Sequence, residues 1–375
     1  MTIDTPYYVL NTDRLLANLQ GPLARLRREA DCSVLIALKG FSFPPALSIM
    51  APWLDGVSAS GSYEARLGHD TIGKAVFVYN PAFRPSEMDD VATYGSHICF
   101  NSMAQYRLYA DAMCGKGVSC GIRINPQCST LPSTFRANPC QPYSRLGILH
   151  EDMPALETFG PNKIEGIHLH TMCEQYPAAL AENIDLLIER YDEYLRRIRW
   201  LNLGGGQLFA ANTYDIDAAI AQINRLHALY DCQIYVEPCE GIVVDTTRLV
   251  MTVQDIVHNE VDIAILDGSA VCHVPDTTYI GWKRPIEGAD MDPTARPYHY
   301  RLTGCSCYAA DVWGDYSFDH PLKVGDRIVI EDIGAYSIVK GNYFNGLVMP
   351  PVVFQSGDDY TVAKAYDYRT FISEQ

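Results

Sequence analysis

Short apolar runs recur along the first two thirds of the chain, and each ends in polar residues or glycine. Between them, apolar side chains return every three to four positions, which is typical of amphipathic helices. The clearest helical segments are Thr12–Arg28, Ser102–Met113, Pro177–Arg197 and Ile216–Leu229. The apolar runs, each predicted to be a strand, are CSVLIALK, GVSAS, AVFVYNP, HICFN, VSCGIRINP, IEGIHLHT, WLNLGGG and QIYVEPCE. Strands and helices alternate, so the strands are predicted to be parallel.

Eight such units within residues 12–243 favour a closed TIM-like (β/α)8 barrel over an open doubly wound sheet, whose GxGxxG fingerprint is absent. After about Val243 the pattern changes to short strands separated by turns, with no long amphipathic helix. These strands are LVMTVQDIVH, VDIAILDGS, YHYRLTG, DRIVIEDIGAYSIV and PPVVFQ. We therefore predict an α/β protein with a barrel at residues 12–243 and an antiparallel β domain at residues 1–11 and 244–375.

Composition narrows the class of protein. With 375 residues, 48% of them hydrophobic, the chain can bury a full core in two domains. No run reaches the roughly 20 apolar residues of a membrane span, and the start lacks a signal-type core, so we expect a cytoplasmic protein. Twelve cysteines without a regular framework predict reduced thiols. A formal net charge of −16 argues against nucleic acid and anionic membrane as partners and favours a cationic ligand.

The strand ends carry the candidate chemistry, because barrel enzymes react at the carboxyl ends of their strands. The first strand ends in Lys39, one of only eight lysines in the chain. Desolvation there would lower the pKa of the amine and suit a Schiff-base lysine. A lysine whose amine reaches solvent at the barrel mouth explains the pattern equally well. Arg123 ends the fifth strand.

Later strand ends add further candidates, each with an alternative structural role. The run Gly204–Gly206 leaves backbone N–H groups unshielded, which suits a phosphate, although such runs are more often flexible turns. Glu237 could pair with a protonated pyridine nitrogen or with an arginine. His168 and His170 share a strand face, and His170 could stack on a planar ring. Such a His-x-His pair also suits a metal, so a metal-dependent hydrolase is the alternative from a different class.

Motifs that are spread over nearly the whole chain point to a known family. They are TPYYVLNTDRLLANL, LIALKGFS, NPCQPYSRLGI, HLHTMCE, LNLGGG, YVEPCE, HVPD, CYAADVWGDYSF, PLKVGDRIVI and YFNGLVMP. With these motifs in this order, the chain resembles fold-type III pyridoxal-phosphate enzymes, and among them the carboxynorspermidine/carboxyspermidine decarboxylases. The resemblance implies decarboxylation of an amino acid that carries a distal cationic amine, with pyridoxal 5'-phosphate as cofactor and no metal. It also implies a homodimer with shared active sites.

The resemblance assigns roles to particular residues. It places the cofactor covalently on Lys39 and against Arg123, His170, Gly204, Gly205, Gly206, Glu237 and Tyr336. Cys307 would enter the partner subunit's site and donate a proton after carbon dioxide leaves; otherwise it is an inert thiol. Substrate contacts would come from Asp267 and Asp311, which could instead cap turns, and from the weaker candidates Arg145, Glu174, His273 and Asp276.

Two departures from the family's pattern leave the substrate open. Cys239 stands where relatives usually have the glycine of EPGE, and Val271 stands where the family commonly has glutamate. A lost carboxylate would matter if it binds a substrate amine, because a hydrogen bond to a charged group contributes about 1.5–3 kcal/mol. The alternative is therefore a related decarboxylase of diaminopimelate, ornithine, arginine or a specialised metabolite.

Overall fold

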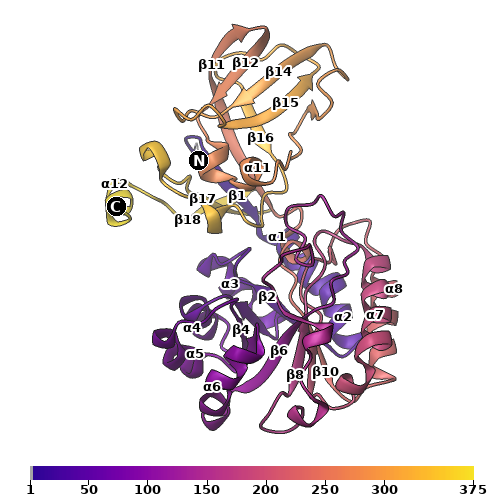
Figure 1. Ribbon diagram of the computed structural model, residues 1–375. Helices are drawn as coiled ribbons and strands as arrows, with labels where there is room; N and C mark the ends of the chain where they lie inside the picture. The colour runs from indigo at the N-terminus through magenta and orange to yellow at the C-terminus, as the bar shows by residue number, and fades with distance from the viewer. Residues whose placement is uncertain (1–2) are drawn as a thin grey trace. The chain divides into compact units, whose positions relative to one another are not determined.

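The structure of the protein is a computed structural model that describes residues 3–375. Its described residues form two compact units, drawn in Figure 1. The barrel unit is Asn18–Ile242. The sheet unit combines residues 3–17 with Val243–Gln375, so it is built from both ends of the chain.

The barrel unit contains a closed sheet of eight parallel strands, as the sequence predicts. All eight predicted strands are present: β2 Cys32–Ala37, β3 Gly56–Ala59, β4 Ala75–Tyr79, β5 His97–Phe100, β6 Ser119–Asn125, β8 Gly166–Leu169, β9 Trp200–Asn202 and β10 Gln233–Val236. Each strand pairs in parallel with its neighbours, and the pairing of β10 with β2 closes the ring. A short strand, β7 (Ile148–Leu149), pairs with β6 outside the ring. The predicted fold class is confirmed.

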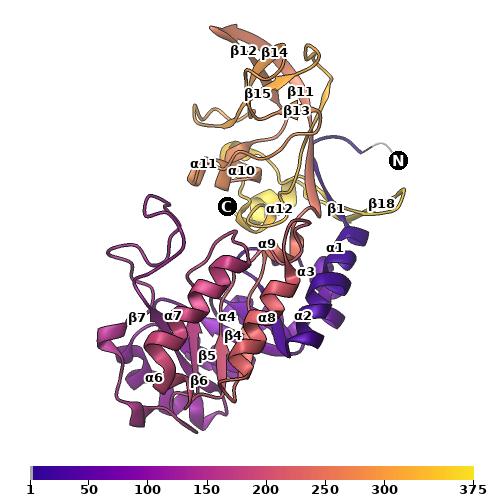
Figure 2. The ribbon, with the colours of Figure 1, turned by 90° about the vertical axis from the view of Figure 1, so that its right-hand side faces the viewer.

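Helices surround these strands, and Figure 2 shows α7 and α8 side by side on the outside. The helices of the barrel unit are α2 Ala24–Glu29, α3 Pro44–Met50, α4 Ser62–Thr71, α5 Met88–Tyr94, α6 Met103–Gly115, α7 Pro177–Leu195 and α8 Ile216–His227. The predicted single helix Thr12–Arg28 is divided into α1 (Thr12–Asn18), a π-helical segment (Leu19–Leu23) and α2. Pro22 lies in the π-helical segment, and proline cannot donate the bond that a regular helix requires. The short α9 (Glu240–Val243) follows β10.

One cluster of the barrel core explains two glycines inside strands. Leu35, Phe77, Cys99 and Trp200 pack together, and all are buried. A Cβ at Gly121 or Gly166 would collide with the indole ring of Trp200. Glycine in β6 and β8 therefore makes room for this ring.

The sheet unit contains nine strands in one mixed sheet. They are β1 Tyr7–Asn11, β11 Thr247–Asn259, β12 Val261–Leu266, β13 Ala289–Asp290, β14 Tyr298–Thr303, β15 Val312–Phe318, β16 Arg327–Ile330, β17 Val352–Ser356 and β18 Asp359–Lys364. Most pairings are antiparallel, as predicted, but β1 with β17 and β12 with β14 are parallel. Besides most of α1, this unit contains the short helices α10 Ala270–His273, α11 Asp276–Tyr279 and α12 Tyr368–Ser373.

Strand β1 shows how this sheet is packed on its two faces. Tyr8 and Leu10 are fully buried, and the Tyr8 hydroxyl donates a hydrogen bond to the His273 carbonyl. Tyr7 and Val9 point to the opposite face, as the two-residue repeat of a strand requires. There they form an apolar cluster with Val250 and Val353.

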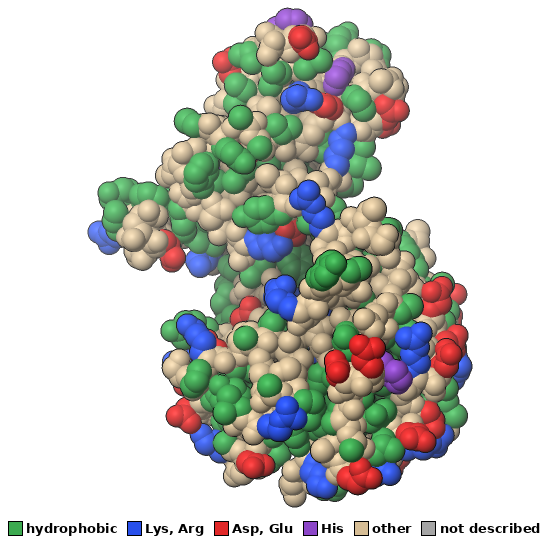
Figure 3. All heavy atoms as spheres, in the orientation of Figure 1, with side chains coloured by type: hydrophobic (Ala, Val, Ile, Leu, Met, Phe, Trp, Pro, Cys, Tyr) green, Lys and Arg blue, Asp and Glu red, His purple; other side chains and the backbone are tan. Residues whose placement is uncertain are grey.

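Three global properties bear on the class of protein. No helix among residues 3–375 is long and apolar enough to cross a membrane. All twelve cysteines are free. Acidic and basic side chains are interspersed on the face of the barrel unit seen in Figure 3.

Candidate active site

Lys39 follows β2, whose side chains before it are almost all buried. The residue keeps solvent access, yet protein atoms surround its amine closely enough for desolvation to lower its pKa. Glu237 opposes this lowering and Arg123 adds to it. A lowered pKa leaves more of the amine neutral, which is the form that attacks a carbonyl.

Glu237 directly follows β10 and is buried. Its Oε1 accepts a hydrogen bond of 2.6 Å from Nδ2 of Asn202. Burial raises the pKa of the carboxyl group, while nearby Lys39 and hydrogen bonds from Asn202 and Ser58 lower it. The carboxyl group is thus held in place from two strand ends and lies within electrostatic range of the lysine.

Arg123 projects from β6 and is buried. Its guanidinium lies over the ring of Tyr79, 4.6 Å from the centroid. Nη2 donates to the carbonyl of His170 at 3.3 Å, whereas Nε has no partner among the described residues. A buried, unpaired guanidinium N–H is costly, so its presence indicates a site arranged for a ligand.

His168 and His170 both lie against the groups just described. Burial lowers the pKa of each imidazole well below its ordinary value, so both are neutral near pH 7. Nε2 of His168 is 3.7 Å from Oε2 of Glu237, and neither ring nitrogen of His168 has a hydrogen-bond partner within residues 3–375. His170 accepts a bond of 3.1 Å at Nδ1 from the N–H of Gly205.

The glycine run after β9 is a close-packed turn. Gly204 and Gly206 have φ of 67° and 95°, in the left-handed region that favours glycine. A Cβ on Gly205 would collide with the carbonyl of Glu237. The N–H of Gly204 donates to Oδ1 of Asn202 and that of Gly205 to His170. Within the described chain, the N–H of Gly206 alone among the three lacks an acceptor.

Two weaker candidates also belong to the barrel unit. Arg145 is close enough to Tyr79 to lower its pKa against the larger effect of burial, so it lies on the Arg123 side of the site. Its carbonyl accepts a bond from Asn101 at 2.8 Å. Glu174 has φ of 48° in the segment after β8.

Three residues of this site were not predicted. Asn202 and Ser58 bond to Glu237, and Tyr79 lies under Arg123. Each stands at or near a strand end, in LNLGGG, GVSAS and AVFVYNP. An inventory of neutral polar residues at the strand ends would have found them.

The carboxylates expected to face the substrate are already bonded within the sheet unit. Asp311 is buried and accepts from the backbone N–H groups of Ala270, Val271 and Ser306 at 2.7, 3.3 and 3.2 Å. Asp267 accepts from the N–H of Thr252 at 2.8 Å. These bonds match the alternative role, in which each aspartate caps a turn.

His273 and Asp276 are likewise buried within the sheet unit. Nδ1 of His273 accepts from the N–H of Ser269 at 3.1 Å, and burial lowers its pKa to about 4. Asp276 forms an ion pair with Lys340. The same ammonium lies over the ring of Tyr336, 4.7 Å from its centroid, so Tyr336 and Asp276 share one partner.

Cys307 is exposed on the sheet unit, beside Cys305. Its N–H donates to Oδ1 of Asn345 at 2.7 Å. The next residue, Tyr308, packs edge-on against Phe344 with centroids 6.2 Å apart, and both rings are exposed. An exposed thiol beside exposed aromatic rings is accessible to another molecule.

The two departures from the family pattern lie in different units. Cys239 is buried in the barrel unit, where burial raises the pKa of its thiol while Lys39 lowers it. The side chain of Val271 is apolar and forms no hydrogen bond. Its backbone N–H donates a hydrogen bond to the Asp311 carboxylate, and its carbonyl accepts one from the Asn342 side chain.

The alternative interpretation, a metal-dependent hydrolase, requires a cluster of metal-ligating side chains. Within residues 3–375, no group of three or more histidine, cysteine, aspartate or glutamate side chains is placed to hold a metal ion. The rings of His168 and His170 have centroids 6.4 Å apart.

Comparison with known proteins agrees with this geometry. A family model described as "Pyridoxal-dependent decarboxylase, C-terminal sheet domain" matches residues 76–334. This match, on a parallel barrel with a lysine after its first strand, defines the class of pyridoxal-dependent decarboxylases.

Individual relatives narrow the class. The carboxynorspermidine/carboxyspermidine decarboxylase of Campylobacter jejuni is 34% identical over an alignment of 380 positions that covers 98% of each chain. The carboxyaminopropylagmatine decarboxylase of Synechocystis is 36% identical over 373 residues, covering 99% of this chain and 95% of the relative. A crystal structure of Campylobacter jejuni carboxynorspermidine decarboxylase complexed with norspermidine matches with a TM-score of 0.88 and 33% identity, over 100% of both chains. The chain therefore belongs to the carboxynorspermidine/carboxyspermidine decarboxylase family, as its motifs predicted.

Proposed function

We propose that the protein uses pyridoxal 5'-phosphate to decarboxylate carboxynorspermidine or carboxyspermidine, releasing norspermidine or spermidine. One observation carries the proposal. At the carboxyl ends of strands of one parallel barrel, the charges of Lys39, Arg123 and Glu237 lie close enough together to influence the pKa values of Lys39 and Glu237. An amine of lowered pKa beside a buried carboxyl group and a buried guanidinium is suited to a cofactor that carries an aldehyde, a ring nitrogen and an anion.

The barrel residues fit this cofactor. Arg123 Nε and both ring nitrogens of His168 are buried without hydrogen-bond partners among the described residues. The backbone N–H of Gly206, in the adjacent glycine turn, also lacks an acceptor in the described part of the chain. Lys39 would bind the cofactor covalently, and Glu237 would pair with its pyridine nitrogen. When bound, pyridoxal phosphate supplies the electron sink that makes loss of a Cα carboxylate accessible.

The protein's own groups orient and tune this chemistry. Asn202 and Ser58 hold the Glu237 carboxyl group through hydrogen bonds, so that it faces Lys39. His170 is fixed by its bond from Gly205 and, being neutral, presents an uncharged ring face. Tyr336, which stands in the family motif GAYSIV, would add a further contact to the phosphate.

Cys307 is proposed as the group that returns a proton to Cα, acting in the partner subunit's site of a homodimer. Its support is its exposure and its place in the family motif. A buried thiol could not enter another subunit's site. Asp267 and Asp311 receive less support as substrate contacts, because their oxygens already accept bonds within the sheet unit.

A cationic substrate is consistent with the net charge of −16. Carboxyaminopropylagmatine is the second candidate, because the Synechocystis relative named for it is as similar as the others, at 36% identity. The two candidates differ at the distal end of the substrate, where one would present an amine and the other a guanidinium.

The cofactor is tested by visible spectroscopy of the purified protein with added pyridoxal phosphate, before and after borohydride. The wild type should show a chromophore that borohydride reduces and fixes to the protein. Lys39→Ala should not, and Lys116→Ala, which removes an exposed lysine from the same unit, should behave as wild type. A wild type with no reducible chromophore would refute the proposal.

The substrate is tested by measuring carbon dioxide release from carboxynorspermidine, carboxyspermidine, carboxyaminopropylagmatine, diaminopimelate, ornithine, lysine and arginine. The proposal expects the highest kcat/KM on one of the first two. Activity confined to the last four would show that the cofactor assignment holds while the polyamine assignment fails.

Sharing of the active site is tested by mixing two inactive variants. If Lys39 and Cys307 act together across subunits, a hybrid of Lys39→Ala and Cys307→Ala subunits has one intact site. Random reassociation then restores about a quarter of wild-type activity. Cys305→Ala, which removes the neighbouring exposed thiol, should retain full activity alone. No recovery in a verified hybrid would place both residues in the site of one subunit.

A further inference from the structure

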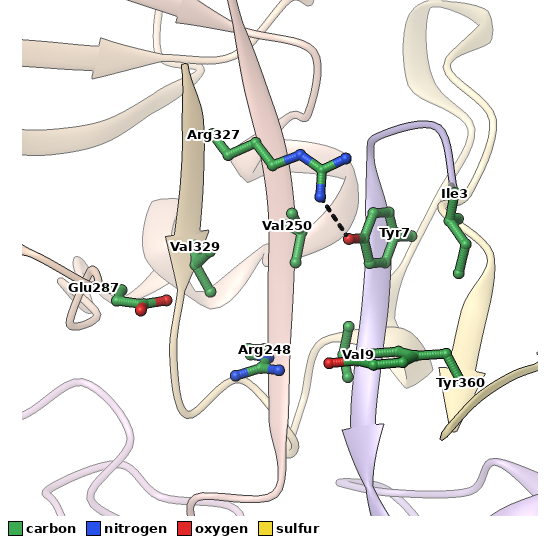
Figure 4. Close-up of a pocket in the computed structure, with 9 residues that line it drawn as sticks. All are labelled: Ile3, Tyr7, Val9, Arg248, Val250, Glu287, Arg327, Val329 and Tyr360. Atoms are coloured by element: carbon green, nitrogen blue, oxygen red, sulfur yellow. Dashed lines mark hydrogen bonds between the residues drawn. The ribbon is translucent and has the colours of Figure 1, made fainter. Parts of the chain in front are cut away.

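A pocket lies wholly within the sheet unit, on the face of the sheet formed by β1, β11 and β16 (Figure 4). Its volume is about 490 Å³, within the range of small-molecule sites. None of its lining residues belongs to the barrel unit, so it is independent of the Lys39 site.

The floor of this pocket is apolar because of strand register. Tyr7 lies opposite Val250 in the pairing of β1 with β11, and Val250 lies opposite Val329 in the pairing of β11 with β16. Side chains that are directly opposite share a face, so these three and Val9 form one continuous surface. Val353 is also buried in this cluster, and Val329 and Ile3 pack at its margin.

Two guanidinium groups border the apolar floor, and neither is neutralised. Arg327 donates from Nη1 to the hydroxyl of Tyr7 at 3.3 Å, and Arg248 donates from Nη2 to Oε1 of Gln355 at 2.9 Å. Both acceptors are uncharged, and no carboxylate within residues 3–375 pairs with either arginine. Each guanidinium has five N–H donors, so most remain available to a ligand.

The remaining borders are one carboxylate and one aromatic ring. Glu287 lines the pocket, and its side chain has no ion pair or hydrogen bond in the described part of the chain. Tyr360 contributes a ring that is 40% exposed. With two positive groups against one negative group, the pocket favours an anion, although the protein as a whole is strongly acidic.

We propose that this pocket binds a small organic carboxylate with a flat apolar body. The apolar body would lie on the valine floor beside the tyrosine rings, where burial of apolar surface favours it. Its carboxylate would bond to Arg248 or Arg327, whose planar donors match a carboxylate in two-point geometry. An amino acid with an apolar side chain shares this chemistry, and its ammonium group would face Glu287.

The test uses the full-length protein and hydrocinnamate as the probe, followed by saturation-transfer NMR and titration calorimetry. Saturable binding is expected at about millimolar concentration or below, with hydrocinnamamide, the neutral analogue, at least about tenfold weaker. Phenylalanine tests the amino-acid source, and phenylpropylamine should not compete. Spermidine, which is a cation, should not compete either.

Substitutions locate the binding. Arg248→Gln and Arg327→Gln should each weaken hydrocinnamate about tenfold. Glu287→Gln, an exposed change that leaves the core intact, should tighten it about threefold. Arg301→Gln is the matched control, because Arg301 is on the same unit but already pairs with Asp315. Its affinity should equal that of the wild type.

Three results would overturn the proposal. The first is no saturable binding at about 10 mM. The second is equal affinity for acid and amide, or equal loss in all three arginine variants. The third is a halved mass for Arg327→Glu in light scattering, which would make this face an interface between copies of the chain. None of these readouts depends on decarboxylation, so the outcome stands whatever the substrate proves to be.

Discussion

Arg123 and His168 of the barrel unit differ from the buried aspartates of the sheet unit in how fully their polar atoms are bonded. In the barrel unit, Arg123 and His168 keep buried polar atoms without partners among the described residues. In the sheet unit, Asp311 and Asp276 are just as buried but are bonded to backbone N–H groups or to a lysine.

The difference distinguishes residues that are placed to bind a ligand from residues that stabilise the fold. Native proteins rarely leave buried polar groups unpaired, because each costs about 1–3 kcal/mol. Where such groups cluster around a lysine of lowered pKa, the cost is consistent with a site that a ligand completes. Where a buried group is fully bonded to backbone N–H groups, as Asp311 is, it stabilises a turn.

Glu237→Gln should have the largest effect on activity, and it tests the difference between ligand-binding and structural residues. The amide can still accept the bond from Asn202, so the melting temperature should change little. The lost carboxylate should lower kcat/KM by about a hundredfold or more, because a preorganised charge is removed. Steady-state kinetics and calorimetry measure both, and Glu182→Gln, on the exposed side of α7, is the control. A stability loss with normal kinetics would put Glu237 among the structural residues.

Asp311→Asn should show the opposite behaviour. An amide replaces one of two acceptor oxygens by a donor, which must then face a backbone N–H of Ala270 or Ser306. We expect a loss of about 1–3 kcal/mol in the free energy of unfolding and an unchanged substrate KM. Urea denaturation and kinetics check this, with the exposed Asp319→Asn as control. A tenfold rise in KM at full stability would instead support a substrate contact.

Acid should weaken both units through buried histidines of lowered pKa, and one histidine in each unit tests this. Burial lowers the pKa of His97 in the barrel unit and of His273 in the sheet unit from 6.5 to about 4. Between these values the unfolded chain binds more protons, so stability falls as pH drops from about 6.5 to 4. The slope is at most about 1.4 kcal/mol per pH unit for each group.

His97→Phe, which can keep the stacking on Phe77, and His273→Gln should each flatten this slope in urea titrations followed across that pH range. The neutral-pH stability of each variant is the reference, since only the change with pH reports protonation. Slopes identical to wild type in both variants would assign acid sensitivity to other groups.

The smallest effect is expected for exposed ion pairs, where the two units should not differ. Arg196 pairs with Asp192 on α7, and Arg301 pairs with Asp315 across β14 and β15. Because both pairs are solvated, Arg196→Gln and Arg301→Gln should leave the melting temperature essentially unchanged. A clear fall in the melting temperature of only one of the two variants would mean that surface ion pairs also differ between the two units.

Much of the fold follows from local sequence pattern. The eight strand runs and the lysine that ends the first of them are visible because periodicity and burial are properties of neighbouring residues. The division of Thr12–Arg28 by a π-helical segment was not predicted, although Pro22 was the available signal. The parallel pairing of β12 with β14 joins strands that are distant in sequence, which no local pattern specifies.

The candidate site shows the same limit. Lys39, Arg123 and Glu237 stand out by charge at strand ends, whereas Asn202 and Ser58 matter only through their bonds to Glu237. The role of Asp311 could not be chosen from sequence, because turn-capping depends on N–H groups about forty positions away. Likewise, the apolar floor of the pocket in the sheet unit depends on cross-strand register rather than on any motif.

The construction of the sheet unit from both chain ends has a consequence for biosynthesis. Strand β1 leaves the ribosome first, but its neighbours β11 and β17 begin at Thr247 and Val352. At about 5–20 residues per second, β1 waits roughly ten to fifty seconds for its first partner. During this interval the barrel can complete its ring, while the apolar β1 segment remains exposed to chaperones and to β1 segments of neighbouring nascent chains.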